Sequence, residues 1–184
     1  VSFRQNGVHT LGEKIVDTTI SNISSYHYGG PQFQYSNGRY YLATEYYWIT
    51  GERRDGYTVY DDYSAEGGSI YGQYFFNSDA TVKISSKKGK IGGVKCKAKF
   101  GCTAAKFMLE SIDTRDGELN GLNGTHGKAV HIGLNHYFNS NVRLMVDATR
   151  GVYLGGHNDF YSDGNRADRR HTMTSIQARL HAKF

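Results

Sequence analysis

Apolar and polar residues alternate strictly over the last segment of the chain. Within residues 175–184 the apolar parity comprises Ile176, Ala178, Leu180, Ala182 and Phe184, and the polar parity comprises Ser175, Gln177, Arg179, His181 and Lys183. A period of two is typical of a β-strand with one apolar face. In a soluble sandwich that face would pack on a core, whereas in a transmembrane barrel it faces lipid and the basic face lines the lumen.

The same alternation recurs upstream and predicts two hairpins. Apolar parities over residues 130–138 and 142–149 flank Asn139-Ser140-Asn141, which indicates two long strands joined by a tight turn. Asn37-Gly38 is a strong type I′ turn signal, and the segment after it has Tyr40, Leu42, Thr44, Tyr46 and Trp48 on one parity.

Short turns alternate with long polar segments, which span roughly residues 6–22, 53–67, 114–126 and 155–171. This alternation is typical of a transmembrane barrel with tight periplasmic turns and long outer loops. With the C-terminus at the periplasmic side, both predicted turns are periplasmic. That orientation requires an even number of strands between Asn77 and Gly101. We expect two, over about 80–87 and 91–99; a single strand would reverse the direction of everything before it.

Composition agrees with a barrel that has a wet lumen. The chain has 184 residues with a mean hydropathy of −0.59, and no apolar run approaches the ~18 residues of a membrane helix. It contains 23 Gly, 15 Tyr and a single Pro, and no stretch has helical periodicity. We therefore predict one all-β domain over residues 1–184. Because Val1 follows no signal peptide, we expect a mature protein or a part of a longer one.

The two cysteines, Cys96 and Cys102, exclude a disulfide-dense scaffold and a four-cysteine zinc site. If a three-residue turn is centred on Lys99, the two face each other across a hairpin, and an oxidising periplasm would permit a bridge. Two unpaired small hydrophobic side chains are the alternative.

Basic residues concentrate between positions 83 and 99. The cluster has seven lysines and no acid: Lys83, Lys87, Lys88, Lys90, Lys95, Lys97 and Lys99. On a strand over 91–99, Lys95, Lys97 and Lys99 share one face, and Val94, Cys96, Ala98 and Phe100 share the other. A row of ammonium groups on a low-dielectric wall provides a path for anions. A solvated basic hairpin is the alternative interpretation.

Further inward charge is predicted from the parity of the long strands. Arg143, Arg179 and Lys183 join the three lysines as the anion-pathway residues, and Lys83, Lys87, Lys88 and Lys90 form a secondary basic group. Lys106 adds to this charge, while Asp147 and Glu110 partly offset it. The net charge of +5 alone does not distinguish phosphate, nucleic acid and lipid headgroups.

Enzymatic and nucleic-acid functions find little support. His131 and His136 differ by an odd number and so point to opposite faces of a strand, which excludes a shared metal site. No nucleophile-elbow, zinc-protease or P-loop motif is present. The tyrosines lie apart from the lysines and suit an interfacial girdle better than base stacking. We expect no catalysis, cofactor, metal or nucleic acid.

Several segments resemble the phosphate-selective porin O and P family. Gly133-Leu134-Asn135-His136-Tyr137 with Asn141-Val142-Arg143-Leu144-Met145 resembles the family's G-L-N-W-Y and N-V-R-L-M segment, and residues 176–180 with Phe184 resemble its closing strand. Residues 49–54 and the basic stretch 88–97 also resemble family segments. The sequence departs from the family pattern at Gly93, Cys96, Ala104 and Met108, which weakens the case for phosphate specificity but not for a pore.

The resemblance implies a homotrimer of 16-stranded antiparallel up-and-down barrels in the bacterial outer membrane, of which this chain would supply about 8–9 strands. It also implies a passive, anion-selective channel for phosphate or polyphosphate-like anions. The expected partners are inorganic phosphate or other small anions, outer-membrane lipid and lipopolysaccharide. A small closed barrel of 8–10 strands with an adhesion or envelope-structural role is the alternative, and a soluble polyanion-binding sandwich is a third possibility.

Overall fold

A computed structural model describes residues 2–6, 14–19, 23–53, 63–77, 80–85, 90–114, 126–154 and 170–182. All regular structure in these ranges is β-strand, as predicted. The described residues include no helix long and apolar enough to cross a membrane. The strands are β1 (Ser2–Asn6), β2 (Lys14–Thr19), β3 (Ile23–Gly29), β4 (Gln32–Asn37), β5 (Tyr40–Arg53), β6 (Tyr63–Phe75), β7 (Ala80–Ser85), β8 (Lys90–Cys96), β9 (Cys102–Asp113), β10 (His126–Tyr137), β11 (Val142–Leu154) and β12 (Arg170–Ala182).

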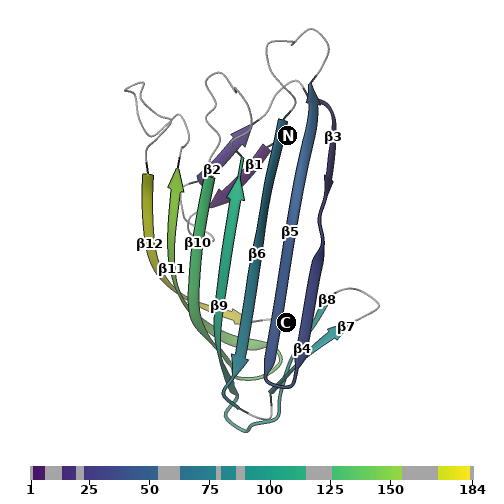
Figure 1. Cartoon of the computed structure of the whole chain (residues 1–184). Helices are drawn as coiled ribbons and strands as arrows, with labels where there is room; N and C mark the ends of the chain where they lie inside the picture. Colours follow the sequence, from purple (N-terminus) through teal and green to yellow (C-terminus); the bar gives the residue numbers. More distant parts are fainter. Residues whose placement is uncertain are drawn as a thin grey trace.

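The strands form one large antiparallel sheet and two small ones. The large sheet has the order β12-β11-β10-β9-β6-β5-β3, with β4 also pairing β5, so that β3 and β4 pair with successive parts of the same neighbour. Figure 1 shows its long strands side by side in a tall, curved wall. The edges do not pair with each other in the described part of the chain. The structure therefore gives no support to a small barrel closed by these residues alone.

Short and long connections lie at opposite ends of this wall. β4 and β5 are joined by Gly38 and Arg39, and β10 and β11 by residues 138–141, whereas the connections at the other end span residues 54–62, 114–125 and 155–169. We call the two ends the short-turn end and the long-loop end. The predicted alternation is thus confirmed except between β6 and β9, where residues 76–101 form a long connection at the short-turn end. The long segments are shorter than expected in places, because β2 lies within 6–22 and β6 begins at Tyr63.

The first tight turn differs in register from its prediction. Asn37 still pairs with Tyr40, so the two loop residues are Gly38 and Arg39 rather than Asn37 and Gly38. Gly38 has φ +55° at the first central position, a left-handed conformation that both primed hairpin turns require there and that glycine adopts readily. The second turn is as predicted: the Asn139 side-chain oxygen accepts hydrogen bonds from the backbone N–H groups of Asn141 and Val142, at 2.8 and 2.9 Å.

The register gives the wall two chemically distinct faces. A row of paired positions on one face carries Leu42, Gly72, Phe107, Ile132, Ala148 and Ile176. The large apolar side chains in this row are exposed, with Ile132 at 59% and Ile176 at 79% exposure. The adjacent row on the opposite face carries Tyr41, Gln73, Lys106, Gly133, Asp147 and Gln177. We call the first the outward face and the second the inward face. The parities predicted for the last three strands are confirmed.

β7 and β8 form a hairpin of their own and do not belong to the wall. The two predicted short strands exist, but β6 pairs directly with β9, and the β7–β8 hairpin packs on the inward face near the short-turn end (Figure 1). Its apolar side meets the wall in the buried cluster Tyr41, Phe75, Ala80, Val82, Cys102, Ala104 and Tyr137. Phe75 is fully buried there, a burial that contributes about 1.5–3 kcal/mol. The core of the molecule therefore lies between hairpin and wall.

Candidate functional site

The β7–β8 hairpin holds its lysines away from the wall. Lys95, Lys97 and Lys99 are exposed, while Val94, Cys96 and Ala98 pack against the buried cluster. The alternation arises because paired residues of a hairpin share a face, and Val82 pairs with Val94. The strand predicted over 91–99 ends at Cys96, so only Lys95 of the three lysines lies on β8. The alternation of exposed and half-buried side chains continues through Lys99 and ends at Phe100. Phe100 is 82% exposed in the turn before β9, with the Lys99 Nζ 5.6 Å from its ring centroid.

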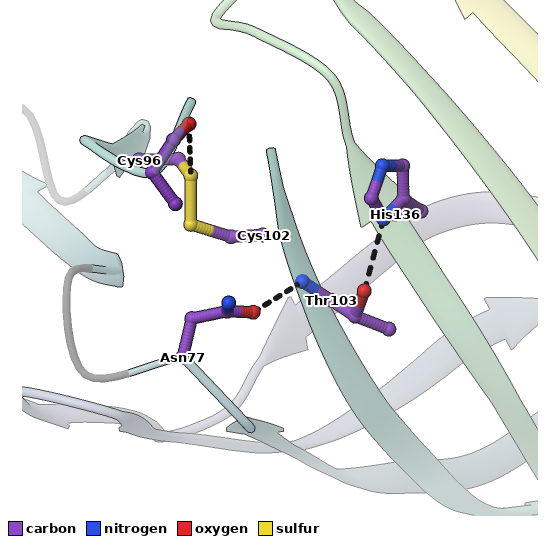
Figure 2. The surroundings of a disulfide bond; sticks show 6 residues. Asn77, Cys96, Cys102, Thr103 and His136 are labelled. Atoms are coloured by element: carbon purple, nitrogen blue, oxygen red, sulfur yellow. Dashed lines mark hydrogen bonds between the residues drawn. A yellow bond between two sulfur atoms is a disulfide. The ribbon is translucent and has the colours of Figure 1, made fainter. Parts of the chain in front are cut away.

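A disulfide between Cys96 and Cys102 fixes the end of β8 to the start of β9 (Figure 2). The bridge was one of two alternatives from the sequence, and the structure shows it; β8 and β9 themselves do not pair. The neighbouring Thr103 is held on both sides. Its backbone N–H donates to the Asn77 side-chain oxygen at 2.9 Å, and its hydroxyl lies 2.9 Å from the His136 Nδ1 (Figure 2). The hairpin is thus anchored at both of its junctions with the wall.

The wall behind the hairpin is basic at the short-turn end. Arg143 pairs with His181, and the next inward pair is Met145 with Arg179. Arg143 is half-buried, and its Nε has no hydrogen-bond partner among the described residues. Guanidinium groups stay charged in proteins and offer several donors to an anion. Arg143 and Arg179 therefore place permanent positive charge on this face, although the Arg143 Nε itself is buried.

A cavity of about 310 Å³ separates the hairpin from this part of the wall. The polar side chains around it form a chain of hydrogen bonds: the Tyr71 hydroxyl donates to the Gln73 side-chain oxygen at 2.7 Å, and the Gln73 amide donates to the Tyr137 hydroxyl at 3.3 Å. Arg143 and His181 line the same cavity. The lining is thus mixed, with valine and tyrosine side chains beside these polar and basic groups.

Charged groups in the middle of the inward face are paired. Lys106 forms an ion pair with Asp147, and the two lie on either side of β10, where Gly133 leaves room for them. Farther toward the long-loop end, the His131 Nδ1 lies 2.8 Å from the Thr149 hydroxyl, and its Nε2 lies 3.1 Å from a Glu110 carboxylate oxygen without hydrogen-bond geometry. The inward face therefore changes from paired charges in its middle to Arg143 and Arg179 at the short-turn end, which form no ion pair with any described residue.

The Lys106–Asp147 pair gives a direct test of this charge distribution. The side chains are only 17% and 15% exposed, so we expect Lys106→Met to lower the free energy of unfolding by about 1–3 kcal/mol, because it leaves Asp147 without its counter-charge. Lys106→Met/Asp147→Leu should recover most of that loss. Urea unfolding in lipid vesicles, followed by the fluorescence of the single tryptophan, Trp48, measures both. Equal losses in the single and double variants would show that the unpaired Asp147 charge is not what destabilises Lys106→Met.

The structure describes five of the six predicted anion-pathway residues. Lys95 is on β8, Lys97 and Lys99 lie between β8 and β9, and Arg143 and Arg179 are on the inward face of the wall, while Lys183 lies outside the described residues. In the secondary group, Lys87 and Lys88 also lie outside them, and only the backbone of Lys83 and Lys90 is described.

Some functional candidates were not predicted from the sequence. The Tyr71–Gln73–Tyr137 hydrogen bonds join β6 to β10, and such neighbours follow only from a register that places β6 beside β9. The only signal for them in the sequence was parity.

His131 and His136 do point to opposite faces, and the described part of the chain contains no group of three His, Cys, Asp or Glu side chains that could hold a metal.

Comparison with known families decides the broad class. A sequence profile described as phosphate-selective porin O and P matches residues 18–184. The chain belongs to this family. The match covers the entire wall of the sheet and the inward hairpin. Comparison with curated proteins gives no match. Membership of this porin family points to a channel of the bacterial outer membrane rather than to an enzyme, and it associates the chain with the passage of phosphate or other anions.

Proposed function

We propose that the inward face and its β7–β8 hairpin line a passive, anion-selective diffusion channel for phosphate or polyphosphate-like anions. The observation that carries the proposal is the row of exposed lysines, Lys95, Lys97 and Lys99, held over an apolar, buried base. Lysines on a low-dielectric support act as successive weak sites between which an anion can move. Arg143 and Arg179 extend this row along the wall, with Lys183 and the secondary group Lys83, Lys87, Lys88 and Lys90 adding positive charge.

The remaining parts of the proposal follow from the family. The outward apolar face contacts lipid, the long-loop end faces the cell exterior, and both edges of the open sheet pair with further strands to close a 16-stranded barrel. Such barrels assemble as homotrimers in this proposal. The Cys96–Cys102 disulfide agrees with this location, because such bonds persist in an oxidising periplasm.

Reversal potentials of the full-length protein in planar bilayers test the selectivity. Under a KCl gradient we expect wild type to prefer anions, and Lys95→Glu or Lys97→Glu to shift the reversal potential toward cation permeation, because each reverses one charge in the path. Arg39→Glu is the matched control: it makes the same charge change at the same end, but Arg39 lies over the outward Tyr74 ring, 5.6 Å from its centroid.

The possible outcomes are distinct. A cation-preferring wild type would reject anion selectivity altogether. Unchanged reversal potentials in both lysine variants, with an anion-preferring wild type, would assign these lysines to a solvated hairpin outside the path. An equal shift in Arg39→Glu would show that net charge, rather than the hairpin, sets selectivity.

A further inference from the structure

On the outward face of the described wall strands, the Asp, Glu, Lys and Arg side chains lie at the long-loop end of the apolar band. Three successive outward rows change from Ile70, Leu109, Val130 and Arg150, through Gly68, Ser111 and Lys128, to Glu66, Asp113, His126 and Arg170. Charged side chains on a lipid-facing surface are costly at the centre of a bilayer and tolerated only near its interface. These rows therefore mark the level at which the protein leaves the hydrocarbon region.

Acids and cations are separated along this rim. On β6 and β9, Glu66 accepts a hydrogen bond from the Tyr46 hydroxyl, and Asp113 lies 2.9 Å from the His126 Nδ1. On β10, β11 and β12, Lys128, Arg150 and Arg170 are exposed and form no ion pair with any described residue. Among the described residues, these two acids thus have partners, whereas the three cations form no ion pair.

Two of the three cations are close neighbours, and the third lies on the same face of the next strand. Lys128 pairs with Val152, two residues from Arg150, so Lys128 and Arg150 are same-face diagonal neighbours about 7–8 Å apart. Arg170 lies two residues from Thr172, the partner of Val152, and is therefore farther from both. The exposed Thr172 and Thr174 add hydroxyl groups on the same face of β12.

A hollow opens directly beside Lys128. It has a volume of about 590 Å³, with Gly68 and Ser111 among the residues that line it. The side of the hollow toward the short-turn end is apolar and is formed by Ile70, Leu109 and Val130. The side toward the long-loop end is polar and is formed by Glu66, Asp113 and His126. A Cβ on Gly68 would lie 2.7 Å from the Glu45 carbonyl oxygen, so this position accommodates glycine only, and no side chain fills the hollow there. Apolar on one side and polar on the other, the hollow matches a molecule with acyl chains and a sugar headgroup.

We infer that this rim binds a phosphorylated glycolipid of the outer leaflet. Lys128, Arg150 and Arg170 bind its phosphates, since ammonium and guanidinium groups pair strongly with phosphate oxygens. The sugar lies in the hollow, where the Glu66 and Asp113 carboxylates accept hydrogen bonds from its hydroxyls, and the first methylenes of an acyl chain contact Leu109 and Val130. This inference rests on the proposed orientation, in which the long-loop end faces the cell exterior.

Native mass spectrometry of the full-length protein tests the site with bis-phosphorylated lipid A as the probe. We expect Lys128→Gln/Arg150→Gln/Arg170→Gln to weaken lipid A binding on the order of 100-fold, because each cation near a lipid surface strengthens binding about five-fold. Lys95→Gln/Lys97→Gln/Lys99→Gln removes the same charge from the inward face and should bind lipid A as wild type does. Heat-dependent migration in SDS gels confirms that both variants are folded.

Each other outcome overturns the inference in a recognisable way. Unchanged binding in the outward variant would show that the three cations do not hold the lipid. Equal losses in the outward and inward variants would attribute binding to net charge. Dephosphorylated lipid A or phosphatidylglycerol binding as tightly as lipid A would remove the phosphorylated glycolipid as the ligand. Lipid binding is measured without any ionic current. Failure of the proposed anion selectivity and failure of the proposed lipid site can therefore be told apart.

Discussion

Gly101→Ala is expected to destabilise the folded protein by about 3 kcal/mol, because a side chain is excluded here on two grounds. Gly101 has φ +88°, in the left-handed region that L-residues with a Cβ avoid. A Cβ at this position would also lie 2.3 Å from the Tyr137 backbone oxygen and 3.1 Å from the Phe138 Cα. Neither contact can be relieved by a side-chain rotation. The backbone must move at the junction where the disulfide meets β9.

The control is a second glycine that also has a positive φ but at which an added Cβ would meet no other atom. Gly38 has φ +55° in the β4–β5 turn, and nothing lies within 4 Å of a Cβ built there. Gly38→Ala should therefore cost only about 1 kcal/mol, the penalty of the left-handed conformation alone. Urea midpoints from Trp48 fluorescence in vesicles give both values. If the two variants lose the same stability, the close approach to Tyr137 is not a constraint.

Strand parity was readily predicted from the sequence wherever the two faces of the wall differ. Over residues 130–134, 142–148 and 176–182 the apolar side chains lie mainly on the outward face and the polar ones on the inward face, so a shift of one residue would turn these side chains to the wrong side. This is why residues as far apart as Leu134 and Ala178 were assigned to the same face. The tight turn at 139–141 was predicted equally well, because asparagine side chains can satisfy the turn's backbone N–H groups.

Placement of the β7–β8 hairpin was not predictable in the same way. A short strand with an apolar side at Val94, Cys96 and Ala98 has the same pattern whether that side meets lipid or the inner wall. The difference depends on β6 pairing with β9, a contact between segments about thirty residues apart that no local pattern specifies. The Lys106–Asp147 pair was hidden for the same reason, since it needs three strands in register and Gly133 between them.

Removing the hairpin is expected to increase single-channel conductance several-fold and to reduce anion preference. The wall does not need the hairpin for its own pairing: β6 and β9 remain in register up to Phe75 and Ala104, and the Phe76 N–H donates to the Thr103 carbonyl oxygen at 3.0 Å. An Asn-Gly turn in place of residues 78–102 can therefore join the two strands, and it removes both cysteines together. Tyr41 and Phe75 would then face water, so a loss of stability should accompany the larger current.

A variant that keeps the hairpin but not its charge separates the two causes. Lys95→Gln/Lys97→Gln/Lys99→Gln preserves the volume on the inward face, so in concentrated salt, where fixed charges are screened, it should conduct as wild type does. In dilute salt it should share the reduced anion preference of the deletion. A deletion with wild-type conductance in concentrated salt would place the hairpin outside the ion path. The buried cluster would then serve stability alone, and Arg143 and Arg179 on the wall would have to account for any selectivity.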